Sequence, residues 1–129
     1  MEFGLVAIVL FTVLFGIIQF GIWFWAWQQT GHAAREASRF AAVYPECTDK
    51  ISDRGTDALK GAPVVDGTQT VARTSTAPTQ IGDDVTVTVT ATAIDIGFFG
   101  SMFSPNISKE ATSRVENIPA SACPPVVTP

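Results

Sequence analysis

The feature that most constrains this chain is an uncharged apolar segment near its N-terminus. From Phe3 to Gly31 the sequence contains no Asp, Glu, Lys, Arg or His. About 20 apolar residues are enough to cross a bilayer, and a buried helix of this length without a polar stripe is rare. A signal peptide begins with basic residues and has a shorter apolar stretch, whereas Glu2 is acidic. The segment therefore predicts a membrane-spanning helix.

Three tryptophans mark one end of this span. Trp23, Trp25 and Trp27 lie just before Gln28 and Gln29. Indole rings concentrate at the membrane–water interface, because one edge is apolar and the N–H requires a partner. We therefore place one interface near these three residues.

Small and polar residues interrupt the apolar run. Gln19 is predicted to hydrogen-bond across helices, or simply to lie near the end of the span. Gly4, Gly16 and Gly21 either let neighbouring helices approach closely or reflect how common glycine is in spanning helices. The sequence leaves both pairs of alternatives open.

Beyond the span the helix is predicted to continue to about Val43. Ala33, Ala37, Phe40, Ala41 and Tyr44 recur at three- and four-residue spacing and give one apolar face. Pro45 ends the run, since proline disfavours helix at the residue before it. We expect two domains: residues 1–44 as a long apolar helix with an exposed extension, and residues 45–129 as a small β-rich domain.

The second part reads as a short helix followed by strands. Residues 48–60 predict a short helix, weakened by Gly55. Residues 84–94 alternate valine or alanine with threonine, which is typical of a half-buried strand. Residues 69–75 predict a partner strand, and residues 107–118 favour a third strand over a helix. The predicted fold class is α+β, a long N-terminal helix followed by a small antiparallel sheet.

Two further segments carry distinct compositions. Residues 94–103 are rich in Ile, Phe and Met around two glycines, and they either close the small core or form an apolar patch for a partner or the membrane surface. Residues 119–129 contain four prolines and predict an extended tail.

The two cysteines, Cys47 and Cys123, follow the long helix and lie in the tail, respectively. Neither belongs to a metal-ligand pattern. A disulfide between them would require an oxidising compartment, so we expect the C-terminal part to be extracytoplasmic. The alternative is two unrelated free thiols.

The sequence offers no catalytic or cofactor-binding motif. His32 is the one histidine, and no nucleophile motif accompanies it. Asp66-Gly67 and Asp83-Asp84 lack calcium-loop spacing and predict turns. With 8 Lys+Arg and a net charge of −4, direct nucleic-acid binding is disfavoured. We expect no enzyme activity, no metal and no cofactor. Asn106-Ile107-Ser108 fits the glycosylation acceptor pattern, which occurs easily by chance.

Three sequence blocks in the N-terminal third are similar to the TadE-like pilin proteins of tight-adherence (Tad) pili. They are Glu2–Val6 (EFGLV), Gly16–Gly21 (GIIQFG) and Ala33–Ala42 (AAREASRFAA). The later Arg114-Val115-Glu116 fits the family more loosely. The chain departs from the family pattern at Ile8, where the family usually has proline, and at Gln19, where it often has glutamate. The printed sequence does not include the basic leader of the family, so Met1 is interpreted either as the start of a fragment or as the mature N-terminus after a prepilin peptidase has acted.

The resemblance implies a structural pilin or minor pseudopilin that assembles through its apolar helix. In type IV pilins the glutamate corresponding to Glu2 faces the N-terminal ammonium of an adjacent subunit, which would set the register of assembly. The expected assembly residues also include Phe3, Gly16, Gln19, Gly21, Arg35 and Arg39.

The resemblance further implies partners and a location. The expected partners are other pilin subunits, the membrane, a prepilin peptidase and the pilus assembly platform. The protein would lie in the cell membrane before assembly and in an extracellular pilus afterwards. Arg35 and Arg39 would by themselves place their side of the span in the cytoplasm. A basic leader that holds the N-terminus inside would resolve that conflict.

A second hypothesis is a single-span accessory subunit of a membrane complex, which needs no prepilin leader. A membrane-anchored hydrolase is a third and is disfavoured, because no catalytic constellation is present.

Overall fold

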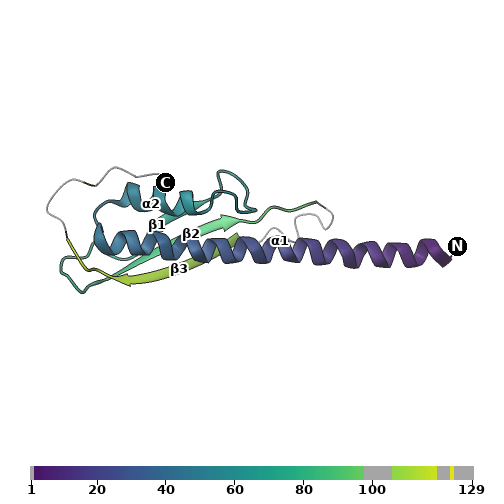
Figure 1. Ribbon diagram of the computed structural model, residues 1–129, viewed down its shortest axis with the longest axis horizontal. Coiled ribbons are helices and arrows are strands. Elements are labelled where there is room, and N and C mark those ends of the chain that lie inside the picture. The colour runs from purple at the N-terminus through teal and green to yellow at the C-terminus, as the bar shows by residue number, and fades with distance from the viewer. Residues whose placement is uncertain (1, 98–105, 119–122, 124–129) are drawn as a thin grey trace.

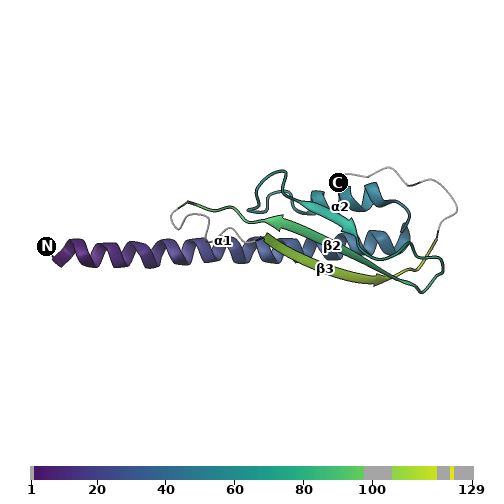
Figure 2. The same ribbon diagram turned by 180° about the vertical axis from the view of Figure 1, so that it is seen from behind.

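The computed structural model describes residues 2–97, 106–118 and 123. Of the apolar segment 94–103, residues 98–103 lie outside the described residues. Of the tail 119–129, only Cys123 is described. The described part contains the following elements: helices α1 (Glu2–Val43) and α2 (Thr48–Ala58), and strands β1 (Thr70–Arg73), β2 (Asp84–Thr92) and β3 (Asn106–Arg114). They form the predicted α+β fold. The N-terminal half of α1 projects beyond the sheet, and its C-terminal half lies against it (Figures 1 and 2).

The long helix α1 is continuous from the apolar segment into the globular part. It passes through Ile8 without a break, as expected from the lack of proline there. It ends at Val43, two residues before Pro45. The prediction of one helix from the membrane span to about Val43 is therefore confirmed.

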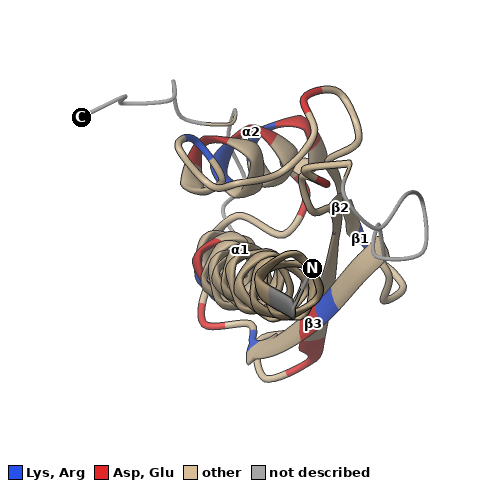
Figure 3. Ribbon diagram, turned by 90° about the vertical axis from the view of Figure 1, so that its right-hand side faces the viewer, with Lys and Arg blue, Asp and Glu red and all other residues tan. Residues whose placement is uncertain are grey.

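The three strands form an antiparallel sheet in the order β1-β2-β3. Thr70 pairs with Thr90 between β1 and β2, and Thr88 pairs with Glu110 between β2 and β3. The alternation in β2 is as predicted: Val85, Val87 and Val89 are fully buried, whereas the intervening threonines are partly exposed. Both helices cover the valine face of the sheet (Figure 3).

Small side chains on α1 form the surface on which the sheet lies. The buried residues on this surface are Ala33, Ala34, Ala37, Ser38, Ala41 and Ala42. Short side chains let the sheet approach the helix backbone closely, and the Ser113 hydroxyl of β3 donates a hydrogen bond to the Ser38 hydroxyl oxygen (Oγ–Oγ 3.0 Å). The predicted apolar face is confirmed at Ala33, Ala37 and Ala41. Phe40 and Tyr44 are only half-buried, and their rings contact each other in a tilted arrangement (centroids 5.3 Å apart).

Helix α2 packs on α1 and β1 through Ile51 and Gly55. An ideal Cβ at Gly55 would lie 2.7 Å from both methyl carbons of Val71 in β1. The glycine that weakens the helix by propensity therefore allows the helix and strand to touch.

We expect Gly55→Ala to lower the free energy of unfolding by about 1 kcal/mol. Alanine gains up to about 1 kcal/mol of helix propensity, but overpacking a tight contact costs about 1–3 kcal/mol. Chemical denaturation measures the difference. Gly31→Ala is the matched control, because its new Cβ would meet only an ordinary contact with Arg35 at 3.8 Å and should be neutral or stabilising. Equal effects at both positions would contradict the packing explanation.

The turn predicted at Asp66-Gly67 is present, whereas the one predicted at Asp83-Asp84 lies slightly earlier: Asp83 closes it through its N–H to the Gln80 carbonyl, and Asp84 already begins β2. Gly67 and Gly82 have φ of 79° and 99°, which glycine adopts without steric cost. The Asp83 carboxylate accepts hydrogen bonds from the backbone N–H groups of Thr79 and Gln80. This carboxylate therefore stabilises the turn that leads into β2.

Candidate functional site: the apolar helix and the end of the sheet beside it

The N-terminal half of α1 exposes large apolar side chains on all sides. Phe3 is 88% exposed, and Ile8, Leu10 and Ile17 are also exposed. The helix is long and apolar enough to cross a membrane, and only 6% of its most apolar window is buried. Soluble proteins rarely expose such a surface, so this half of α1 has the composition and exposure expected of a surface that contacts lipid or other apolar helices.

The tryptophan cluster lies where this surface meets the globular part. Trp23 packs against the core, whereas Trp25 is 51% exposed. Phe20, Phe24 and Trp27 form a continuous stack along one side of the helix. Trp27 also forms a cation–π contact with Lys109 of β3, whose ammonium lies 3.5 Å from the ring centroid. Such a contact ties β3 to the aromatic cluster.

Gln19 joins the apolar half of α1 to the chain that follows β2. Its side chain is only 2% exposed. Its amide nitrogen donates to the Ile94 carbonyl oxygen (3.2 Å), and its amide oxygen accepts from the Ile96 backbone N–H (3.1 Å). Both polar atoms of a buried side chain are thus paired within the same chain, as burial requires. The hydrogen bond predicted to another helix is here made to backbone of residues 94–96.

We expect Gln19→Leu to release this segment locally. The change leaves the Ile94 carbonyl and the Ile96 N–H without these partners, at a cost of about 1–2 kcal/mol. Amide hydrogen exchange at Ile96 should accelerate about tenfold, because about 1.4 kcal/mol corresponds to one decade. Gln28→Leu, at an exposed position of the same helix, should change nothing at Ile96. If exchange at Ile96 is unchanged in Gln19→Leu, the two Gln19 hydrogen bonds do not hold this segment.

The other predicted assembly residues lie along α1 and do not converge on one point. Gly4 and Gly21 have open space where a Cβ would be. Arg35 and Arg39 are exposed and form no ion pair with any described residue. Glu2 begins the helix, at the end farthest from the sheet (Figure 1).

The predicted disulfide between Cys47 and Cys123 is present, with a Cα–Cα distance of 5.7 Å. It connects the segment after α1 to the C-terminal tail across 76 residues of sequence. Arg73 adds a second tie in this region by donating to the carbonyl oxygen of Pro45. The segment after α1 is therefore linked covalently to Cys123 and by a hydrogen bond to β1.

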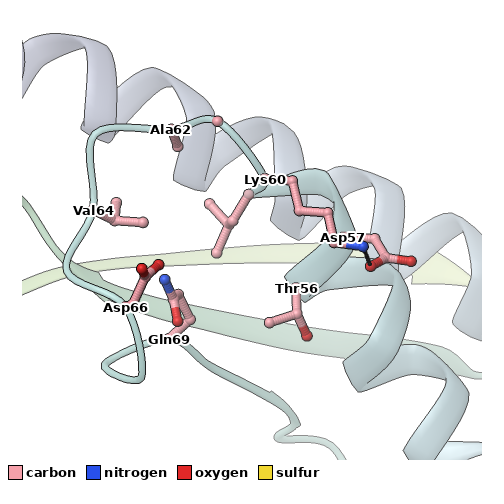
Figure 4. A pocket seen from close by; sticks show the side chains of 9 residues that line it. Thr56, Asp57, Lys60, Ala62, Val64, Asp66 and Gln69 are labelled. Carbon is pink, nitrogen blue, oxygen red and sulfur yellow. Dashed lines mark ion pairs between the residues drawn. The ribbon is translucent and has the colours of Figure 1, made fainter.

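The described residues of the globular part line several surface hollows. One hollow of about 430 Å³ lies between the end of α2 and the loop before β1 (Figure 4). There Lys60 pairs with Asp57 (2.7 Å), while Asp66 and Gln69 lie on the facing loop. Across residues 2–97, 106–118 and 123, no group of three His, Cys, Asp or Glu side chains is placed to hold a metal ion.

A protein-family model matches the part of the chain that contains the exposed helix and does not extend to the sheet. Residues 1–39 match the family described as TadE-like protein. The matched part contains the apolar surface, Gln19 and the tryptophan cluster, and it amounts to less than a third of the 129 residues. The resemblance predicted from the three sequence blocks is thus confirmed for this region. Neither the curated proteins nor the solved structures contain a significant match to the chain.

Several contacts of this site could be predicted only weakly, or not at all, from the sequence. Gln19 was recognisable as the polar residue in an apolar run, but its partners are 75 and 77 residues away. Lys109 had no signal, because an alternating strand does not say what its side chains meet across the fold.

Proposed function

We propose that the chain is a structural subunit of a Tad-type pilus, either a pilin or a minor pseudopilin, and has no enzyme activity. The observation that carries the proposal is the exposed apolar half of α1, which coincides with the region that matches the TadE-like family. In a filament, neighbouring apolar helices would cover this surface. The open positions at Gly4 and Gly21 support close helix packing, since small residues let backbones approach.

In this proposal, assembly depends on residues of α1. Glu2 sets the register through an adjacent subunit's N-terminus, and Phe3, Gly16, Gln19 and Gly21 contribute to helix packing. Arg35 and Arg39 lie on the exposed extension. Gln19 already satisfies its amide within the chain, so its share in assembly would be exerted through the segment that it holds.

The proposed location follows from the same division of the chain. The apolar helix of residues 1–44 lies in the cell membrane before assembly and in the filament core afterwards. Residues 45–129 form an extracytoplasmic domain, supported by the disulfide, which forms in oxidising compartments. This domain would serve adhesion or priming. A prepilin peptidase and a pilus assembly platform are the further proposed partners.

Site-specific photo-crosslinking tests this assignment. A photoreactive residue at Ile17, on the exposed apolar surface, should crosslink to pilin subunits in filaments sheared from the native host. The same probe at Ile81, an exposed isoleucine near the C-terminal end of α1, is the control and should give far less of this product. Crosslinks from Ile17 to a membrane complex without pilins would favour the accessory-subunit hypothesis instead.

A further inference from the structure

A short segment after β2 lies beside the part of α1 that is suited to a membrane. Gln19 holds Ile94 and Ile96 directly against the helix. Both isoleucines are exposed, at 41% and 42%. The segment runs from the end of the sheet towards the N-terminal half of α1 (Figures 1 and 2). We call residues Ile94–Gly97 the tip.

The length of the span places the tip at the bilayer surface. Residues 3–18 measure only about 24 Å as a helix, less than the roughly 30 Å of a hydrocarbon core. About 20 residues counted from Phe3 end near Ile22, beyond Gln19. Shifting the bilayer towards the N-terminus would bring the charge of Glu2 into hydrocarbon, which is unfavourable for an unpaired carboxylate. Tilting the helix would increase the number of residues needed.

The tryptophan cluster gives the same depth independently. Trp23, Trp25 and Trp27 mark the interface, where indoles settle. Gln19 is four residues before Trp23, which is about 6 Å nearer the bilayer centre. The tip, bonded to Gln19, therefore lies on the membrane side of the aromatic residues. Apolar groups of interfacial segments enter to about this depth, 5–10 Å into the headgroup and acyl boundary.

We propose that the tip is a second membrane-contact site, in which Ile94 and Ile96 enter the lipid interface beside α1. The partner is the lipid bilayer, and the contact is continuous with the apolar surface of the helix. Together with the helix it would fix the globular part at the membrane surface and restrict its tilt. This inference requires the helix to span a bilayer, and it does not depend on a role in pili.

Depth-dependent quenching tests the proposal on the full chain. The two native cysteines form the disulfide, so an introduced cysteine can be labelled alone with an environment-sensitive fluorophore without reductant. The labelled variants are Ile96→Cys and Ile94→Cys at the tip, Leu10→Cys within the span, and Ile81→Cys as control. Each is reconstituted at high dilution in phosphatidylcholine vesicles without nitroxide lipids, with lipids that carry a nitroxide near the top of the acyl chain to probe the tip, and with lipids that carry it near the end of the acyl chain to probe Leu10. Ile81 is, like the tip residues, an exposed isoleucine (69%), but it lies beside Gly82, whose backbone N–H donates to the Val115 carbonyl oxygen near the C-terminal end of α1.

The expected result is loss of fluorescence at both tip positions, comparable with the loss at Leu10, and none at Ile81. Quenching at Leu10 without quenching at the tip would overturn the proposal while leaving the spanning helix intact. A blue-shifted tip probe that nitroxide lipids do not quench would also overturn it, because protein would then cover the tip. No quenching at Leu10 would overturn the span and the proposal together.

Discussion

Replacing both Cys47 and Cys123 with serine is expected to lower the free energy of unfolding by about 4 kcal/mol. The disulfide closes a long loop of 76 residues, and in the chain-entropy model the cost of closing such a loop in the unfolded chain gives this magnitude. For a globular part of this size the corresponding fall in Tm is about 15–30 °C. Thermal unfolding of the oxidised protein and the double variant in the same detergent measures it.

The matched comparison is the native chain before and after reduction. Reduction should reproduce the effect of the double substitution, and the double variant should not respond to reductant at all. A double variant with unchanged Tm would show that the tail contributes nothing to the fold, and it would remove the main support for an oxidising compartment.

Ile51→Ala is expected to cost about 3 kcal/mol, within the range for deleting a buried isoleucine side chain. Ile51 is 1% exposed and lies in the cluster formed by Ala37 and Ala41 of α1 with Val85 and Val87 of β2. The α1 alanines are too short to fill the space that the change would leave. Denaturant unfolding of the full chain measures the loss.

Ile81→Ala serves as the control for that change. Ile81 is 69% exposed, so its truncation removes no buried contact and should stay within about 0.5 kcal/mol of the native chain. A loss below 1 kcal/mol for Ile51→Ala would contradict the view that α2 is held by this one large side chain.

The sequence predicted those parts of the fold that depend on local periodicity. The apolar run and the alanine spacing predicted α1, and the alternation of valine with threonine predicted β2 and the side of it that is buried. The disulfide followed from the presence of only two cysteines in positions without a metal pattern. The periodic patterns extend over neighbouring residues only, and the disulfide prediction needed only the number of cysteines.

The contacts that define the site could not be predicted in the same way. The hydrogen bond between Gln19 and Ile96 joins residues 77 apart in the sequence. The Lys109 ammonium contacts the Trp27 ring only because β3 lies along α1. The role of Gly55 was also hidden. Its helix propensity is unfavourable, and its advantage appears only when Val71 approaches from a different element. Long-range packing decides all three.

The most direct test of the central claim is where the mature chain is found in its native host. Cells are sheared, and the filament and membrane fractions are probed for the chain by mass spectrometry, with and without prepilin peptidase activity. A pilus subunit predicts recovery in sheared filaments that disappears when the peptidase is inactivated. Recovery only in the membrane fraction, unchanged by loss of the peptidase, would contradict the account.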